Sequence, residues 1–294
     1  MNKLPVYDIE DFESMSEVLY ANTFQDHIKK HPFVNRPHKH NFFLCVFFTK
    51  GSGTHEIDFN EYKIKPGTLF ILKPGQFHRW DPTPKTEGFI FFHSKALYNK
   101  HYSAKKIEHF PFYTQFNIKH AFEISKGESP FLEGLFAKIV EEFDLKKPSF
   151  EDAVLSLIDL IYITLVRKSF PTGLGAKIHS PHYMQMLDKL EQLIEKKFTT
   201  LKSPSEYAEL MNISEKHLNR ICKESLGKSL QQIISERIVL EAKRMLSSSA
   251  APVAQIAESL GYTDISYFTR VFKKSNGVSP KIFRMQALGI HTED

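Results

Sequence analysis

The chain has 294 residues, 41% hydrophobic and 25% charged, which is the composition of a globular protein long enough for one large domain or two ordinary ones. Its formal net charge of +5 arises entirely within residues 183–286, where 16 Lys and Arg accompany 11 Asp and Glu, and this favours a polyanionic partner for that segment alone. The acidic N-terminus does not fit a secretory signal, and the longest apolar stretch is too short to span a bilayer. The widely separated Cys45 and Cys222 favour free thiols. We therefore expect a cytoplasmic protein without a membrane segment.

Residues 37–94 alternate short apolar runs with turn signals. The run FFLCVFF is dense in strand-forming residues and is followed by the turn GSG. HEIDF and EYKI flank Asn60, LFIL lies between two Pro-Gly turns, and GFIFFH follows. Short strands at this spacing predict a small barrel or sandwich.

Helical periodicity begins near Pro130. The apolar residues that share one face of the first predicted helix are Leu132, Leu135, Phe136, Ile139 and Phe143. A second predicted helix, Phe150 to Lys168, is apolar over most of its circumference, so either its own domain or a second subunit must cover it. The following segment, SFPTGLGAKIHSPH, is typical of a linker.

The C-terminal third contains an internal repeat. SEYAELMNISEKHLNRICKESLGKSL aligns with VAQIAESLGYTDISYFTRVFKKSNGVSP, so that Arg220 matches Arg270 and Gly227 matches Gly277. In each copy a short helix, a tight turn and a second helix with a Ser or Asp N-cap are expected, with Ser214 and Asp264 as these caps. This arrangement is a helix-turn-helix, whose second helix can enter a major groove of DNA.

The second helix of each copy is amphipathic. In the first copy we expect Leu218, Ile221 and Cys222 to face the core; in the second copy, Tyr267, Phe268, Val271 and Phe272. Outward polar residues suit DNA, because Arg can bind guanine, Asn adenine and Lys phosphate; they are Lys216, Asn219, Arg220, Lys223, Ser266, Thr269, Arg270 and Lys273. The alternative is a plain helical bundle with a charged surface.

Between the copies, SLQQIISERIVLEAKRMLSS predicts a helical spacer. About eighteen residues at 1.5 Å each give roughly 27 Å, close to the 34 Å or so between adjacent major-groove turns. The spacer therefore suits two recognition helices in successive grooves on one DNA face.

Residues 184–284 resemble the DNA-binding domain of the AraC/XylS family of bacterial transcription regulators, chiefly through IAESLGYTDISYFTRVFKKSNGVSPKIFR and HLNRICKESLGKSLQQIISERIVLEAKRML. The resemblance implies that bases are read by outward residues of both recognition helices, which by register are Lys216, Asn219, Arg220, Ile265, Ser266, Thr269 and Arg270. This chain departs from the pattern in the first copy, where Cys222 replaces the usual aromatic residue and Leu230 the usual Pro.

The β segment is similar to the cupin-type sensing domain often found in this family, through RPHKHNFFLCVFFTKGSGTHEIDFNEYKIKPGTLFILKPGQFHRW. Three of its histidines, His38, His40 and His78, could bind a metal, as in catalytic cupins. However, the carboxylate that such enzymes carry soon after the second His is missing, so we expect no metal and no cofactor. We expect an organic effector to contact Arg36, His38, His40, His78 and Trp80, while the alternative is that these residues are ordinary core.

The predicted fold is therefore α+β with two domains: a cupin-like β-barrel with a helical dimerisation segment over 1–168, a linker over 169–182, an all-α domain with two helix-turn-helix motifs over 183–286, and a tail over 287–294. We expect a non-enzymatic, sequence-specific transcription regulator, an activator, that senses a small organic effector. Its expected partners are double-stranded DNA, the effector, a second copy of the chain and RNA polymerase. The alternatives are a cupin metalloenzyme or metal sensor fused to a DNA-binding module, and an effector-independent regulator controlled by a protein partner.

Overall fold

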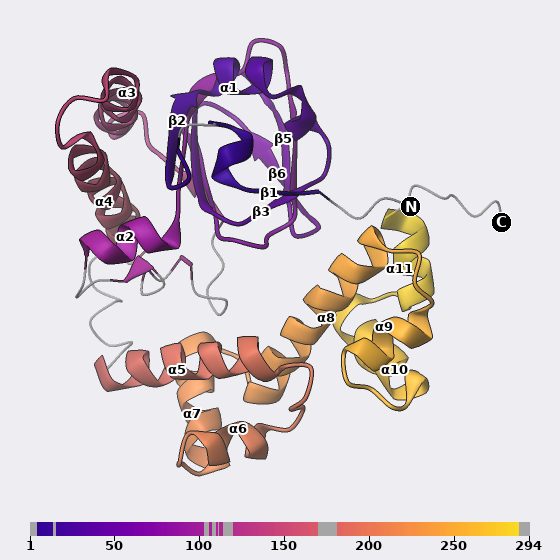
Figure 1. Cartoon of the computed structure of the whole chain (residues 1–294). Helices are drawn as coiled ribbons and strands as arrows, with labels where there is room; N and C mark the ends of the chain where they lie inside the picture. The colour runs from indigo at the N-terminus through magenta and orange to yellow at the C-terminus, as the bar shows by residue number, and fades with distance from the viewer. Residues whose placement is uncertain are drawn as a thin grey trace. The chain divides into compact units, whose positions relative to one another are not determined.

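The computed structural model describes residues 5–13, 16–102, 106–107, 110, 112–113, 120–169 and 181–287. The described residues divide into two compact units, 5–169 and 181–287, which we call the N-terminal and the C-terminal domain. The N-terminal domain is rich in strands and the C-terminal domain is helical, so the predicted α+β organisation in two domains is confirmed (Figure 1). Most of the expected linker and all but the first residue of the expected tail lie outside the described residues.

The strands of the N-terminal domain form three sheets. The five-stranded sheet has the order β10-β7-β4-β9-β2 and the three-stranded sheet the order β6-β5-β8, and both are antiparallel. A short parallel pair, β1-β3, completes the set. The strands are β1 (Val6–Tyr7), β2 (Leu19–Thr23), β3 (Lys39–His40), β4 (Phe43–Lys50), β5 (Gly53–Ile57), β6 (Asn60–Ile64), β7 (Thr68–Leu72), β8 (His78–Pro82), β9 (Glu87–His93) and β10 (Ala121–Glu123).

These sheets correct one detail of the sequence prediction. The described strands pair as separate sheets and do not close into a single barrel, although their arrangement is cupin-like. One isolated antiparallel bridge, between His38 and His78, joins β8 to the residue that precedes β3. The bridge matters for the site below, because it fixes the two histidines side by side.

Strand β4 is the centre of the N-terminal domain. All of its residues from Phe43 to Phe48 are buried, because apolar side chains cover both faces of the five-stranded sheet. On one face Phe47 lies against Phe136, with ring centroids 5.6 Å apart. On the other face Phe48 lies against Phe24, at 4.7 Å. A strand that is apolar on both sides needs a layer on each side, and the sequence run FFLCVFF has that composition.

Short helices and a helical pair complete this domain. The short elements are η1 (Ile9–Asp11), α1 (Phe24–Lys30), η2 (Pro32–Asn35) and α2 (Lys95–His101). The pair α3 (Ser129–Leu145) and α4 (Phe150–Ser169) packs side by side (Figure 1). The apolar face of α4 is covered by its own domain, with Val154, Leu155, Ile158, Ile161, Tyr162 and Leu165 buried. Leu160 on α4 stays 37% exposed and Phe131 on α3 stays 52% exposed.

The C-terminal domain is built on one long helix, α8 (Leu230–Ser248). Helices α5 (Pro181–Lys197), α6 (Pro204–Leu210) and α7 (Glu215–Leu226) lie at one end of it, and α9 (Val253–Ser259), α10 (Ile265–Asn276) and α11 (Pro280–Ala287) at the other (Figure 1). The predicted spacer is confirmed as a helix, with Ile234, Ile238 and Ala242 buried along one side.

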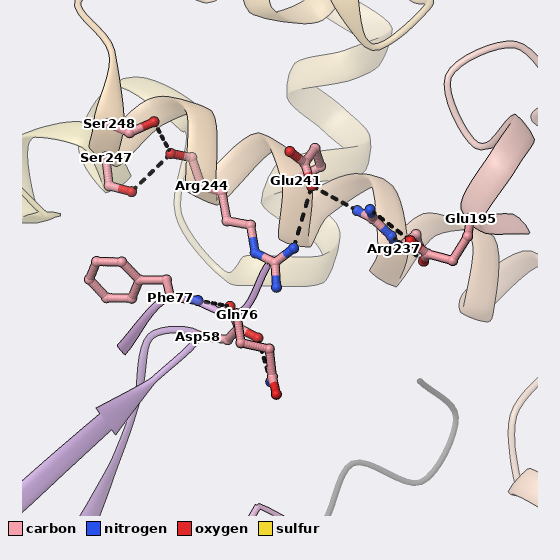
Figure 2. A network of polar contacts seen from close by, with 9 residues as sticks. All are labelled: Asp58, Gln76, Phe77, Glu195, Arg237, Glu241, Arg244, Ser247 and Ser248. Atoms are coloured by element: carbon pink, nitrogen blue, oxygen red, sulfur yellow. Dashed lines mark hydrogen bonds and ion pairs between the residues drawn. The ribbon is translucent and has the colours of Figure 1, made fainter. Parts of the chain in front are cut away.

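Buried polar contacts fasten each domain internally (Figure 2). In the C-terminal domain Arg237 of α8 is 8% exposed and pairs with Glu195 of α5 at 2.6 Å and with Glu241 at 3.0 Å. In the N-terminal domain the Asp58 carboxylate accepts hydrogen bonds from the Gln76 side chain and from the Phe77 backbone. A buried charge needs such partners, so these contacts hold α5 on α8 and the β5–β6 turn on the segment before β8.

Candidate nucleic-acid interface and effector site

The first helix-turn-helix consists of α6 and α7. Ser203 begins α6 through a capping box in which the Glu206 carboxylate accepts from the Ser203 backbone N–H at 2.9 Å. Asn212, with a φ of 56°, makes the turn. The Ser214 hydroxyl then caps α7 by accepting from the His217 backbone N–H at 3.2 Å. Each of these local signals is present in the sequence, so the motif was predicted correctly.

The second helix-turn-helix consists of α9 and α10 and repeats this plan. Gly261, with a φ of 79°, makes the turn. The Asp264 carboxylate caps α10 by accepting from the backbone N–H groups of Ser266 at 2.7 Å and Tyr267 at 3.2 Å. The recognition helices α7 and α10 have 12 residues each, and each ends at a glycine with positive φ, Gly227 or Gly277.

The outward face of α7 is partly occupied by contacts within the chain. Lys216, Arg220 and Lys223 are exposed. Asn219 is half-buried, and its side-chain oxygen accepts the backbone N–H of Leu230 at 3.0 Å. The expectation that Asn219 faces outward therefore holds only in part, because its oxygen caps the first turn of α8.

Arg220 also has partners of its own. Its guanidinium donates to the Tyr183 hydroxyl of α5 at 3.3 Å and to Nδ1 of His217 at 3.1 Å. Nδ1 must then be unprotonated, which is one of the two neutral tautomers of His217. These contacts orient the Arg220 side chain.

The outward face of α10 is more open. Ile265 is 46% exposed, Ser266, Arg270 and Lys273 are exposed, and Thr269 is half-buried. The prediction that Tyr267 packs inward is wrong, since its side chain is 51% exposed. It lies instead beneath Arg270, whose guanidinium carbon is 5.7 Å from the centre of the Tyr267 ring.

The two family departures both lie inside the first motif. Cys222 and Leu230 are fully buried, so this motif has a closed core without the aromatic residue. At the position that matches Cys222, the second motif has Phe272, which packs with Phe268 and Phe283 at 6.0 and 5.7 Å between ring centroids. At this position the first motif therefore has a buried thiol where the second has a buried aromatic ring.

Four of the five predicted effector residues come together in the interior of the N-terminal domain. His38, His40, His78 and Trp80 are all buried. The ring centroid of His78 lies 4.3 Å from that of His38, 5.1 Å from that of His40 and 4.7 Å from that of Trp80. Arg36 is separate from them, because its side chain is exposed and only its carbonyl reaches the cluster, accepting from His38 Nδ1 at 2.8 Å.

Sequence reasoning missed His55, a fourth histidine of this cluster. Its Nε2 lies 3.2 Å from Nδ1 of His78, and across the β5–β8 pair His55 is registered opposite Trp80. The signal was available, since in a strand the residues two apart share a face, and Gly53, His55 and Ile57 alternate with polar residues.

The cluster is polar but uncharged at neutral pH. Burial lowers the pKa of His38 to about 4 and that of His40 to about 3. Burial, together with the neighbouring histidines, lowers the pKa of His55 and His78 well below the ordinary value. The neutral imidazole of His40 donates Nδ1–H to the Phe42 carbonyl at 2.8 Å, which leaves its Nε2 as an acceptor.

Several buried polar atoms in this cluster have no hydrogen-bond partner among the described residues. They are Nε2 of His40, Nδ1 of His55, Nε2 of His78 and Nε1 of Trp80. Buried donors and acceptors are normally paired, so four unpaired atoms on rings that lie against one another require an explanation such as a ligand. Within the described part of the chain, no three His, Cys, Asp or Glu side chains form a group that could hold a metal ion.

Two capped helix-turn-helix motifs in one domain, together with a buried histidine cluster in a separate β-rich domain, are features of a DNA-binding protein with a ligand domain. Comparison with known proteins agrees: a model of helix-turn-helix domains matches residues 207–286, and a model of AraC-like ligand binding domains matches residues 25–91. The chain belongs to the AraC family of transcription regulators. It is thus a DNA-binding transcription regulator with an N-terminal ligand-binding domain.

The chain is also similar to several named proteins. The HTH-type transcriptional regulator YfiF of Bacillus subtilis is 25% identical over 84% of this chain and 78% of its own length. The arabinose operon regulatory protein of Escherichia coli is 20% identical over 86% of this chain and 83% of its own. Among solved structures, ToxT of Vibrio cholerae O395 covers 93% of this chain and 100% of its own at 12% identity, with a TM-score of 0.44. Among the described helices none is long and apolar enough to cross a membrane.

Proposed function

We propose that α7 and α10 bind successive major grooves on one face of DNA and that both read bases. The observation that carries this proposal is the repetition of an exposed arginine, Arg220 and Arg270, at the same register of two capped recognition helices. Helix α8, with 19 residues, is about 28 Å long at 1.5 Å per residue. This length is of the order of the groove-to-groove repeat, about 34 Å.

The outward residues divide by chemistry. Arg220 and Arg270 suit bidentate contacts to guanine, and the exposed Ile265 suits the methyl group of thymine. Ser266 and Thr269 suit either a base edge or a phosphate, and Lys216, Lys223 and Lys273 suit phosphate oxygens. Asn219 retains its amide N–H₂ for DNA, because only its oxygen is bound to Leu230.

This proposal is tested by selecting DNA sites from a random pool with the full chain and then mapping protection on the selected duplex. We expect two protected major-groove segments about one helical turn apart. A single protected segment would contradict the assignment of both helices to base reading.

We further propose that the effector is a small, uncharged organic molecule carrying hydroxyl groups. The buried cluster offers an acceptor at His40 Nε2 and a donor at Trp80 Nε1, and the linked His55–His78 pair supplies one more of each. An anionic effector would need a buried cation to compensate its charge. Among the five predicted effector residues only Arg36 is cationic at neutral pH, and its side chain is exposed.

Trp80 makes this proposal directly testable, since it is the chain's only tryptophan. Intrinsic fluorescence and melting temperature are measured against a panel of neutral monosaccharides and polyols, with the matching sugar acids as charge controls. A binding compound at 100 times its Kd adds about 2.7 kcal/mol of stability. Trp80→Phe removes the indole N–H donor together with part of a buried ring, so it is expected to weaken binding and, through the space it leaves, to lower the free protein's melting temperature. Binding to this variant is read from the ligand-induced shift of its melting temperature. Stabilisation by the acids alone would contradict an uncharged effector.

Activation through RNA polymerase and a homodimeric state complete the proposal. On the α3–α4 pair, the exposed Leu160, Phe131 and Leu145 are apolar residues that a second copy could cover. Sedimentation is expected to show a dimer at micromolar concentration, and Leu160→Glu is expected to shift it towards monomer. A wild-type chain that stays monomeric would remove the dimer from the proposal.

A further inference from the structure

Helix α8 connects the two helix-turn-helix motifs, and the side chain of Lys202 connects them at a second place. Lys202 lies in the loop between α5 and α6, immediately before the N-cap of the first motif. Its Nζ donates to the carbonyl of Phe198 in its own loop and, at 2.6 Å, to the carbonyl of Leu260. Leu260 ends α9 and begins the turn of the second motif, so one side chain connects the entry of the first motif to the turn of the second.

Two neighbouring contacts strengthen this junction. A Cβ atom at Gly261 would lie 1.8 Å from the Thr199 carbonyl oxygen, so the two backbones approach as closely as glycine permits. The Lys202 ammonium also lies 5.1 Å from the centre of the Tyr262 ring. Tyr262 in turn packs against Phe268 of α10, with centroids 5.3 Å apart.

We propose that Lys202 is a positioning residue for DNA binding, which fixes the angle between α7 and α10 by bracing the α5–α6 loop against the turn that precedes α10. A single helix such as α8 constrains the distance between two motifs, but bending and twisting of that helix still change the angle between them. A second contact away from the axis of α8 limits these changes in angle. The consequence is strict selection for the spacing between the two half-sites.

The chemistry of the contact favours bracing over phosphate binding. Lys202 is half-buried, and two backbone carbonyls engage its ammonium. Burial also lowers its pKa to about 8, as expected for an amine withdrawn from solvent. A lysine that binds phosphate needs an ammonium group held out in solvent, as Lys216 and Lys273 are.

The test uses the full chain and a duplex that carries the site selected by the wild-type protein. Companion duplexes have one base pair inserted or removed between the half-sites, which rotates one half-site by about 36° relative to the other. Lys202→Met removes the donors while keeping much of the apolar stem. The matched control, Lys196→Met, removes the same charge from an exposed position of α5.

We expect the preference of Lys202→Met for the native spacing over the altered spacings to fall by about threefold to tenfold, since only part of the free energy of the two lost hydrogen bonds depends on the half-site spacing. Affinity for a single half-site and the salt dependence of binding are expected to match those of Lys196→Met. Unchanged spacing preference would overturn the proposal. A larger decrease in the slope of log affinity against log salt than in the control would also overturn it, because Lys202 would then contact phosphate.

A second measurement needs no DNA, so it also tests the proposal if Lys202→Met binds DNA poorly. Spin labels on Glu209→Cys of α6 and Glu258→Cys of α9, both exposed positions, report the distance between the motifs; the native Cys45 and Cys222 are buried. The distance distribution is expected to broaden in Lys202→Met and to remain narrow in Lys196→Met. An equally narrow distribution in both variants, each folded by circular dichroism, would overturn the brace.

Discussion

The two helix-turn-helix motifs share one backbone plan and differ in what their recognition helices have left to offer DNA. Both have a capped recognition helix of 12 residues, a terminal glycine with positive φ, and an exposed arginine. In the first motif Arg220 is bound to Tyr183 and His217, and the oxygen of Asn219 is bound to Leu230. In the second, Arg270 lies over the exposed Tyr267.

One substitution accounts for the Asn219 contact. Leu230 occupies the first position of α8, where its backbone N–H has no partner within the helix. The matching residue in the second motif is Pro280, which has no N–H to satisfy. In the first motif Asn219 therefore accepts that N–H, whereas Thr269 at the matching position has no N–H of Pro280 to accept. Because Leu230 replaces the usual Pro, the side-chain oxygen of Asn219 is occupied and is not available to bases.

The largest expected difference is in the cores. Phe272→Ala removes a buried ring that packs with Phe268 and Phe283 and is expected to destabilise the C-terminal domain by about 3–5 kcal/mol. Cys222→Ala removes a single buried sulfur and is expected to cost about 1 kcal/mol. Urea unfolding followed by circular dichroism measures both, while Trp80 fluorescence monitors the N-terminal domain as an internal control. Equal costs would mean that the two cores are equivalent.

The next difference is in base reading. Arg270→Ala is expected to weaken binding to the selected duplex by about 1–3 kcal/mol and to relax base preference at one position. Arg220→Ala is expected to cost less, because the free chain already bonds that guanidinium to Tyr183 and His217 and must exchange those contacts for DNA. Titrations against duplexes substituted one base at a time give both values. A larger loss for Arg220→Ala would reverse the ranking of the motifs.

A smaller effect separates the matching pair Asn219 and Thr269. Asn219→Ala leaves the Leu230 N–H without its partner and is expected to lower the free energy of unfolding by about 1 kcal/mol. Thr269→Ala is expected to leave stability nearly unchanged. If both variants unfold at the same urea concentration as the wild type, the capping role of Asn219 is wrong.

The smallest effect concerns the exposed lysines. Lys223→Ala and Lys273→Ala are each expected to reduce the slope of log affinity against log salt by about 0.9, uniformly for all DNA sequences. Binding measured at several salt concentrations on a selected and a scrambled duplex gives the slopes. A sequence-dependent change would indicate base contacts and place these lysines with the arginines.

Features set by neighbours in the chain were predictable from sequence. The caps at Ser214 and Asp264, the tight turns and the helical spacer all depend on residues a few positions apart, and each is present in the structure. The burial of Leu218, Ile221 and Cys222 followed from helical periodicity alone.

Features set by packing between distant segments were not predictable in this way. Asn219 meets Leu230 because α8 starts beside α7, and no local pattern encodes that contact. Tyr267 fits the helical periodicity of a core residue, yet it lies beyond the edge of the buried face. Separate sheets rather than a closed barrel, and the separation of Arg36 from His38, His40, His78 and Trp80, likewise depend on strand pairing across the domain.

The central claim is that both motifs read DNA together, with the second contributing more. It is tested most directly by base-resolved protection of the selected duplex in the wild type, Arg220→Ala, Arg270→Ala and the double variant. We predict that the wild type protects two major-groove segments about one turn apart, that each single variant loses base preference in one segment only, and that the double variant loses it in both. Protection unchanged in the double variant would contradict the account.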